Sequence, residues 1–520
     1  MNINKKVFLV ITILFFSIFT FTSDAHRSTS DEEFLQQQAL RIVLQTPDPD
    51  FVLGESGSFF NYPQFWYPHM QEGGGKLKCK IGIICYPIGI AFSTTAVPFI
   101  FLNQQFNFLT NDSVNYTTED FIEPHYVWWR NSLDPDMTFM ELFYGPFYLS
   151  LAIGVFFLIS RAFNYKITTS ISLAFLLGLS TIFFVYSQTS YSTVPSIFFL
   201  LTGFLYFKKF LDNSKILHST IAASFLVFAF MIRGDVIFFI IPMFVFFIIY
   251  IIKQRQRILK LISFTLPLIL GWQFDKFLES LRYDVNSLAD PSILIDGYAR
   301  GGGENLQGIF GILFSPGVGL FIYVPILLTV FFTYRDFFTR ERKLTVLLLV
   351  ISAVIVIHFS SFTHWEGFTA HPPKYLFSII PFLLLPLGAS IEKRGKKILA
   401  IVIGLGILGF FFNFVTIIQD VSYFVWGQPG GFTGLMSLAQ ERSCPIYICP
   451  EVTWTFQFSP LITTISLALS KLQPDLFLLK LLGIQYYLPL LFSILSIQFY
   501  LLYRIVRSHV TSITQKQKNS

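Results

Sequence analysis

Residues 235–252 read DVIFFIIPMFVFFIIYII, and the basic residues that follow are Lys253, Arg255, Arg257 and Lys260. Beyond its first residue the run carries no charge, and it is long enough to cross the hydrocarbon core of a bilayer as a helix. A cluster of Lys and Arg directly after such a run is typical of the cytoplasmic end of a membrane span. The stretch therefore predicts a membrane-spanning helix that ends in the cytoplasm.

The composition of the whole chain has the same character. Of its 520 residues, 53% are hydrophobic and 13% are charged, whereas a soluble protein carries about a quarter charged residues. The formal charge is only +6, and no soluble segment combines a basic stripe with interleaved aromatic residues, which argues against nucleic acid as a partner. The composition predicts an all-α, polytopic membrane protein embedded in the lipid bilayer.

Apolar runs of spanning length recur along the chain, and we expect about twelve transmembrane helices. They lie near residues 7–22, 142–160, 167–186, 192–207, 216–231, 235–252, 259–274, 309–333, 344–361, 374–391, 398–418 and 484–504. The first run resembles a secretory signal peptide, but no clear small-x-small cleavage site follows it. We therefore favour an uncleaved signal anchor.

The positive-inside rule gives the predicted orientation. The short connections near residues 161–166, 208–215, 253–260, 335–343 and 393–397 are basic, and all fall on the side of Lys5 and Lys6. The basic tail falls there too, so both termini of this multi-pass plasma-membrane protein are expected in the cytoplasm. The long segments are then extracytoplasmic: 23–141, 275–308, 362–373 and 419–483.

Residues 81–102 do not fit a simple count of spans. They are apolar and long enough to cross the membrane, but a span here would move every later basic connection to the outside. Pro87, Gly89 and Pro98 would also interrupt a straight helix. We expect this stretch to dip into the outer face or to lie along it.

An acidic turn, Asp31-Glu32-Glu33, follows the first span. In one interpretation Ser30 caps a short helix and the acids complement its dipole. In the other, the turn is the chemical centre and the spans are its scaffold. Asp24 lies closer to the first span and competes for the same role.

The order of short motifs along residues 1–390 resembles the GT-C glycosyltransferases, which use polyprenyl-phosphate sugars. The resemblance is closest to the branch with the protein mannosyltransferases and the aminoarabinose lipid A transferases. The motifs are 31–35 (DEEFL), 86–89 (YPIG), 186–195 (YSQTSYSTVP), 232–235 (IRGD), 313–323 (LFSPGVGLFIY) and 365–376 (WEGFTAHPPKYL).

This resemblance implies a GT-C-like module over residues 1–418, with external juxtamembrane helices and the acidic external loop 23–141. Residues 419–520 would add an external loop, the last span and a cytoplasmic tail. The implied enzyme is an inverting glycosyltransferase that moves a hexose or pentose from a polyprenyl-phosphate donor to an extracytoplasmic protein, lipid or glycan. Asp31 would be its general base, and Glu32 or Glu33 would be a helper or only a surface acid.

The sequence departs from the family pattern at two positions. Thr193 and Val194 stand where an acid usually precedes the proline of the third-span motif, and Tyr86 stands where one branch has Lys. No phosphate or metal ligand can be carried over to those sites. Lys80 is the nearest substitute for the missing cation.

Two further cations are candidates for the donor phosphate. Arg233 and Lys374 fall on the outer side, where basic residues are otherwise scarce, and departing phosphates need cationic or amide donors. Alternatively, Arg233 pairs with Asp235 while reaching toward lipid headgroups, and Lys374 anchors its helix.

The external loops hold the remaining candidates. Tyr86, Trp365 and His371 would contact substrate, although interfacial aromatic belts explain the aromatic residues equally well. His364, Glu366 and His371 would ligate a divalent ion, or the histidines would simply be hydrogen-bonded loop residues. Cys444 and Cys449 would form a small disulfide loop outside the membrane.

Two other functions remain open at this stage. One is a transporter or flippase of a lipid-linked or small solute, although the chain shows no repeated halves of the kind expected of transporters and its spans contain few ionisable residues away from their ends. The other is a non-catalytic protein of glycan assembly, which would leave the acidic turn without a catalytic role.

The predicted orientation can be tested with reporter fusions at residues 165, 212, 256, 340 and 395. All five should report the cytoplasm, because each lies in or beside a basic connection. A single fusion that reports the outside would contradict the topology.

Overall fold

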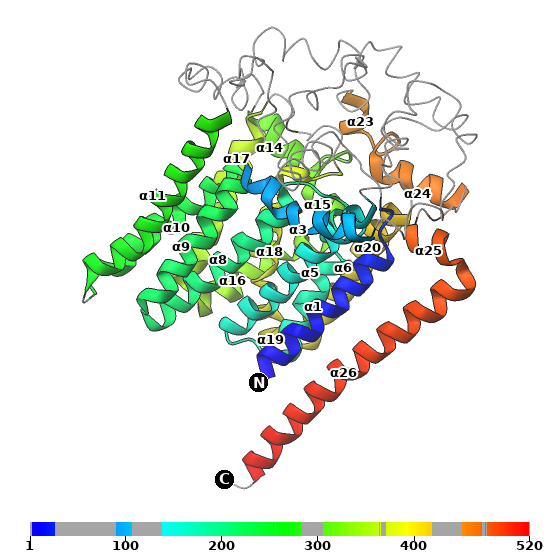
Figure 1. The fold of residues 1–520 in the computed structure, drawn as a ribbon. Coiled ribbons are helices and arrows are strands. Elements are labelled where there is room, and N and C mark those ends of the chain that lie inside the picture. The colour runs from blue at the N-terminus through cyan, green and yellow to red at the C-terminus, as the bar shows by residue number, and fades with distance from the viewer. Residues whose placement is uncertain are drawn as a thin grey trace.

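The computed structural model describes residues 3–25, 90–106, 138–254, 256–282, 305–362, 365, 371–418, 450–470, 474 and 476–518. Within these residues every regular element is a helix, and no β-strand occurs. The longer helices run side by side in one bundle (Figure 1).

The first half of the chain contributes α1 (Ile3–Phe21), α3 (Ile90–Phe106), α5 (Thr138–Ala162), α6 (Ile167–Leu179), α7 (Phe183–Tyr186), α8 (Thr193–Asn213), α9 (Ile216–Ile232), the 3₁₀ turn η7 (Gly234–Val236), α10 (Ile237–Ile251) and α11 (Arg257–Arg282). The second half contributes α14 (Asn305–Phe314), α15 (Leu320–Tyr323), η8 (Pro325–Thr329), α16 (Val330–Arg340), α17 (Arg342–Ser360), η9 (Lys374–Ile379), α18 (Ile380–Leu384), α19 (Leu387–Arg394), α20 (Lys396–Ile418), α23 (Pro450–Trp454), α24 (Pro460–Ser470), α25 (Phe477–Leu482) and α26 (Ile484–Lys518).

Nine helical segments among the described residues are long and apolar enough to cross a membrane. The prediction of an all-helical membrane protein is confirmed at this level. Two of the other predicted spans are shorter apolar helices, Ile167–Leu179 and Ile216–Ile232, and the segment near 309–333 is divided among α14, α15 and η8. The number twelve therefore stays a prediction.

Three predicted spans are interrupted rather than continuous. The breaks lie at residues 180–182, 315–319 and 385–386. Proline accounts for two of them, because Pro316 and Pro386 lack a backbone N–H group that could continue the helical hydrogen bonds. The interrupted segments pack on one another in the bundle: the rings of Phe183 and Phe377 stack with centroids 4.4 Å apart.

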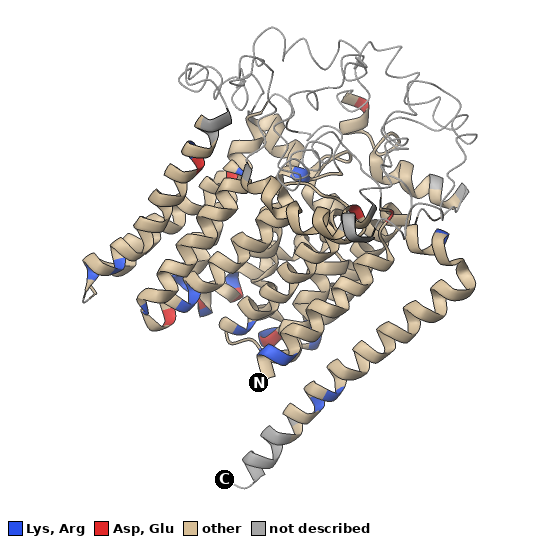
Figure 2. Cartoon of the chain, in the orientation of Figure 1, with Lys and Arg blue, Asp and Glu red and all other residues tan. Residues whose placement is uncertain are grey.

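The bundle has two chemically different ends. At the end we call the loop end, the amide nitrogen of Gln188 donates hydrogen bonds to the carbonyl oxygens of Thr22 and Ile417, which joins the turn after α7 to the ends of α1 and α20. The opposite end, the basic end, holds the start of α1 and many of the Lys and Arg residues of the described helices (Figure 2).

The basic connections gather at this basic end, as the sequence predicts. Arg161 donates to Asn4, Lys209 lies near enough to Lys5 for the two charges to interact, and Arg340 donates to the carbonyl oxygen of Phe163. The sequence predicts that these connections lie on one side of the membrane, and in the structure they lie at one end of the bundle. Which face of the membrane that end meets stays a prediction.

The stretch 81–102 did not fit a simple count of spans. Its residues from 90 onward belong to α3. Its Thr95 hydroxyl is 2.6 Å from the Tyr144 hydroxyl, and its Thr95 carbonyl accepts a hydrogen bond from Tyr148. Phe99 packs on the same two tyrosines. All these contacts fall in the first half of α5, near the loop end, which agrees with a helix that lies at this end and does not run the length of α5.

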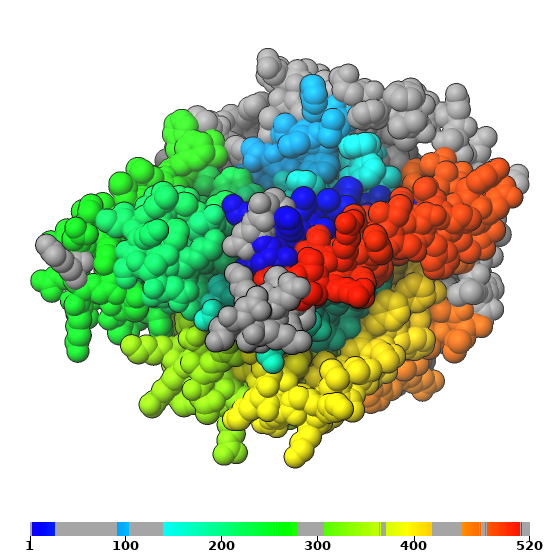
Figure 3. Space-filling model, turned by 90° about the horizontal axis from the view of Figure 1, so that it is seen from below, coloured from blue at the N-terminus to red at the C-terminus, as the bar shows by residue number. Residues whose placement is uncertain are grey.

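α26 forms one side of the bundle. Seen from the basic end it lies along α1 (Figure 3). The Tyr487 hydroxyl donates to the Phe21 carbonyl oxygen at 2.7 Å, and Gln498 donates to Ser17 Oγ at 2.7 Å. Residues beyond 419 thus pack directly on the start of the chain.

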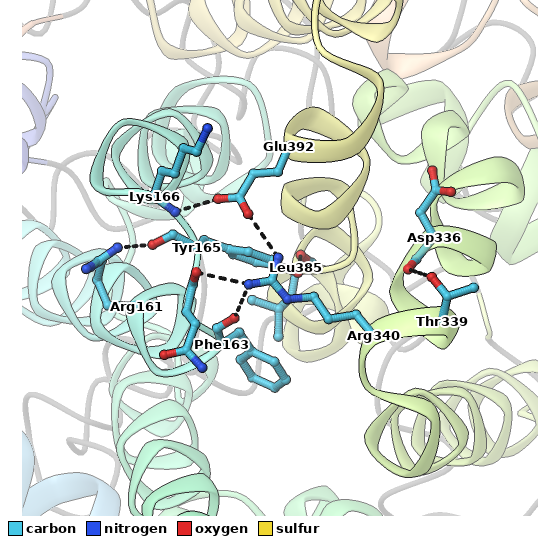
Figure 4. A network of polar contacts seen from close by, with 10 residues as sticks. Arg161, Phe163, Tyr165, Lys166, Asp336, Thr339, Arg340, Leu385 and Glu392 are labelled. Atoms are coloured by element: carbon cyan, nitrogen blue, oxygen red, sulfur yellow. Dashed lines mark hydrogen bonds and ion pairs between the residues drawn. The ribbon is translucent and has the colours of Figure 1, made fainter. Parts of the chain in front are cut away.

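Arg340 connects three segments at the basic end (Figure 4). Its guanidinium donates to Glu392 Oε2 at 2.9 Å and to the carbonyl oxygens of Phe163 and Asn164 at 2.9 and 3.0 Å. It also lies over the Tyr165 ring, 4.9 Å from the centroid. One side chain of α16 therefore provides hydrogen-bond donors both for carbonyl oxygens in the turn between α5 and α6 and for the carboxylate of α19.

Asp336 is the acid in a second group of contacts at this end. It is buried and accepts hydrogen bonds from Ser390 at 2.8 Å, Lys393 at 2.9 Å and Arg394 at 2.5 Å. Burial alone would raise the pKa of the Asp336 carboxyl, but these hydrogen bonds outweigh burial and lower the pKa from 3.8 to about 2. Asp336 is therefore ionised at neutral pH and joins α16 to α19.

We expect Asp336→Asn to lower the melting temperature in detergent, because it removes the charge that Lys393 and Arg394 neutralise. The folded pKa lies below the unfolded value of 3.8, so this stabilisation is present above that pH and is lost as the pH falls toward 2, with a total of about 2 kcal/mol.

The difference in melting temperature between wild type and Asp336→Asn should thus be largest near neutral pH and shrink on acidification. Asp212→Asn is the matched control, because this half-exposed acid pairs with Lys208 alone at the same end. An Asp336→Asn difference that stays constant across the acid range would contradict the role of Asp336.

Candidate functional site at the loop end

The turn between α7 and α8 lies at the centre of the loop end. Tyr186, Ser187, Ser190 and Tyr191 in this turn are all buried. The adjacent Gln188 holds the turn against the ends of α1 and α20. The motif 186–195 therefore occupies an enclosed position, fixed by contacts from distant parts of the chain.

Glu141 brings a carboxylate to this turn from the first turn of α5. Its side chain is buried and accepts a hydrogen bond from Ser190 Oγ at 3.3 Å. The position suits an acid, because the positive end of the helix dipole stabilises negative charge there. Burial of a carboxylate among apolar side chains is otherwise costly.

Gly145, one turn further along α5, allows the turn to come this close. A Cβ atom at Gly145 would lie 2.3 Å from the Ser187 carbonyl oxygen and 2.8 Å from that of Thr189. Any side chain here would push α5 away from the turn. Glu141 and Gly145 together therefore shape the environment of Ser190 and Tyr191.

Asp24 comes close to the start of α5. The chain turns sharply after α1, with Ala25 in a left-handed conformation at φ 56°. Ala25 is buried against Leu142 and Phe477, and the Phe477 N–H donates to the Ser23 carbonyl oxygen at 2.9 Å. Asp24, the alternative to Asp31 as general base, is thus held beside α5, the helix that carries Glu141.

Arg233 ends α9, where its backbone becomes extended. Its Nε donates to Asp235 Oδ1 at 2.7 Å, with 16% of the Arg233 side chain and 12% of the Asp235 side chain exposed. This pair is the one expected if Arg233 reaches toward lipid headgroups instead of binding a donor phosphate. The guanidinium is also near enough to the Tyr186 hydroxyl to interact with it electrostatically, which places Arg233 beside the central turn.

Lys374 reaches the same turn from the start of η9. Its Nζ lies over the Tyr191 ring, 4.9 Å from the centroid, in a cation–π contact. The Tyr191 and Tyr186 rings are themselves 5.8 Å apart. Both candidate phosphate-binding cations therefore lie around one pair of tyrosines, although 140 residues separate them in the sequence.

His371 is a packed, neutral side chain. Its carbonyl oxygen accepts a hydrogen bond from the Tyr186 hydroxyl at 2.8 Å, and its ring meets that of Tyr323 edge to face with centroids 5.4 Å apart. Burial lowers the pKa of the His371 imidazole to about 3. The neutral imidazole is the form that ligates metals.

Trp365 packs inside the loop end. Only 8% of it is exposed. Its ring atoms would lie 2.1 Å from a Cβ at Gly311, and its ring is 5.9 Å from that of Trp454. The indole therefore fills the space between α14 and α23.

Most of the other predicted site residues lie outside the residues that the structure describes. They are Asp31, Glu32, Lys80, Tyr86, His364, Glu366, Cys444 and Cys449. The general base, the metal ligands, His371 included, and the disulfide stay predictions. Across the described ranges, no group of three or more His, Cys, Asp or Glu residues is arranged to hold a metal ion.

Four motifs that are far apart in the sequence converge at the loop end. Tyr186 links motif 186–195 to His371 of motif 365–376, His371 packs on Tyr323 of motif 313–323, and Arg233 of motif 232–235 lies beside Tyr186. Sequence reasoning missed Glu141, whose signal was an acid at the start of an otherwise apolar span.

The chain matches no known protein family, and no curated protein matches it either. Its likeness to the GT-C glycosyltransferases therefore rests on the motifs and their order.

The close approach of α5 to the turn can be tested with Gly145→Ala. Because the new Cβ would overlap the Ser187 carbonyl oxygen, we expect a loss of about 1–3 kcal/mol, seen as a lower melting temperature in detergent. Gly404→Ala in α20 is the control, because nothing lies within 4 Å of a Cβ there. Equal melting temperatures for the two variants would show that the turn is not held as described.

Proposed function

We propose that this protein is a membrane glycosyltransferase that transfers a sugar from a polyprenyl-phosphate donor to an acceptor at the loop end. The observation that carries the proposal is the convergence of four motif segments on Tyr186 and His371. Each segment resembles a motif of one family, and two of them bring the cations Arg233 and Lys374 to this turn.

The charges around this turn suit the chemistry. In the proposed step the Asp31 carboxylate accepts the proton of the acceptor hydroxyl, and the hydroxyl oxygen attacks the anomeric carbon. The bond from that carbon to the phosphate oxygen breaks, and the phosphate leaves with the bonding electrons. Arg233 and Lys374 would bind that phosphate through charge-assisted hydrogen bonds.

The architecture suits a lipid-linked donor. A polyprenyl chain stays in the bilayer, so its phosphate and sugar lie at the membrane surface, where the loop end would meet them. We propose that the loop end is extracytoplasmic and that both termini are cytoplasmic, because the basic residues gather at the opposite end. The plasma membrane is the proposed location.

A transporter of lipid-linked or small solutes is the second candidate, and one observation favours it. The bundle contains interrupted helices, which are common at transporter binding sites. Residues at two of these breaks, Ser180, Thr181 and Ser315, are buried and polar, but none is ionisable. The charged groups lie at the two ends instead, and we therefore prefer the enzyme.

The function can be tested with purified protein, a panel of polyprenyl-phosphate sugars and candidate acceptors. Release of free polyprenyl phosphate should depend on acceptor, and Asp31→Asn should slow it on the order of a hundredfold or more, while Asp24→Asn has a much smaller effect. The amide keeps the shape of the carboxylate but cannot take the proton.

Normal turnover by Asp31→Asn together with an inactive Asp24→Asn would exchange the two roles. Movement of a solute into sealed vesicles without bond transfer would support the transporter instead.

The phosphate contacts predict a separate effect. Arg233→Gln and Lys374→Gln should each raise the donor concentration for half-maximal rate by about tenfold, with little change in acceptor dependence. Lys276→Gln is the control, since Lys276 is a lysine of α11 that lies outside the motif segments. Unchanged donor dependence in both test variants would remove the assignment.

A further inference from the structure

A shallow cavity of about 390 Å³, open to the surface, lies at the turn between α10 and α11. The turn is at the basic end, because the Tyr250 hydroxyl donates to the carbonyl oxygen of Leu211 at the end of α8. α10 and α11 form one edge of the bundle (Figure 1). The cavity is lined by Ile252, Lys253, Gln254, Gln256, Arg257 and Ile258.

Among the described residues, the two cations of this cavity carry no ion pair, unlike several other cations at the basic end. Within the described part of the chain, neither Lys253 nor Arg257 has an acidic partner. By contrast, ion pairs neutralise Lys208, Arg340, Lys393 and Arg394. Two exposed cations that share one cavity attract an anion.

The amide of Gln254 adds a fixed donor. Its Oε1 accepts hydrogen bonds from Lys260 Nζ at 2.7 Å and from Ser214 Oγ at 3.3 Å. Because the oxygen is occupied, the NH₂ group is the part of this amide left to donate. Lys260 is itself buried, so the support for Gln254 is held within the protein.

Exposed apolar side chains continue from the cavity along both helices. The exposed fractions are 68% for Ile249, 55% for Ile252, 68% for Ile258, 50% for Leu259 and 47% for Ile262. In a membrane such side chains contact acyl chains. The cavity therefore offers cations and an amide donor at the level of the headgroups, directly beside two apolar helix faces.

We infer that the turn between α10 and α11 binds one anionic phospholipid, with its phosphate in the cavity and its acyl chains along α10 and α11. The unneutralised cations select the negative headgroup, and the adjacent isoleucines select an amphiphile over a free anion. This inference does not depend on the proposed enzymatic activity.

The inference can be tested by native mass spectrometry of the full-length protein in detergent. The probes are dioleoyl-phosphatidylglycerol, the zwitterionic dioleoyl-phosphatidylcholine and glycerol phosphate. The test variant is Lys253→Gln combined with Arg257→Gln. The control variant is Lys396→Gln combined with Lys397→Gln, which removes the same charge from exposed residues at the start of α20.

We expect the wild type to bind phosphatidylglycerol more tightly than the other two probes. The cavity variant should lose on the order of tenfold in this affinity, and the control variant should keep it, with unchanged melting temperatures throughout. An equal loss in both variants would show diffuse surface attraction and overturn the site, as would no loss in the cavity variant. Glycerol phosphate binding as tightly as the phospholipid would overturn the lipid as the ligand.

Discussion

Charged side chains are costly to place among apolar helices, and this cost divides the molecule into an apolar middle and two polar ends. Helices such as α10 and α20 carry no charge beyond their first turn. Contacts between ionised groups are therefore confined to the ends, where they take two forms. At the basic end they join helices to one another, and at the loop end they surround a single turn.

The two ends differ in how their charges are used. Arg340 and Asp336 each make several contacts that join α16 to α19 or to the turn before α6, so these charges stabilise the bundle. Around Tyr186 and Tyr191, by contrast, Arg233 pairs with Asp235 beside Tyr186, Lys374 lies over the Tyr191 ring, and Glu141 accepts a hydrogen bond from Ser190. These contacts gather charged groups around one turn rather than joining two helices.

Much of the fold follows from the sequence, because long apolar runs and basic connections act locally. The helices and their common basic end were predicted for this reason. The expected interruption at Pro98 was wrong, because α3 continues through this residue. The breaks at residues 180–182, 315–319 and 385–386 were not predicted, because a run such as 167–186 carries no charge and its interruption depends on packing. Gly409 illustrates the point: a Cβ there would lie 2.4 Å from the Ser180 carbonyl oxygen.

The candidate site was harder to predict than the fold. Arg233 and Lys374 stood out as rare cations on one side, and the structure brings them to the same turn. Glu141 did not stand out in the sequence, because it is one acid in a long acidic segment. Its partner Ser190 is 49 residues away, and no local pattern joins the two. The predicted base, Asp31, lies outside the described residues, so motif order remains its only support.

The pairing of α26 with α1 has a consequence for biosynthesis. Ser17 and the carbonyl of Phe21 bond to residues that follow them by 481 and 466 positions, and membrane helices are inserted as they are made. This flank of α1 consequently faces lipid or an insertion factor during most of translation. The nascent chain therefore has to remain stable until α26 has been made and packs against α1.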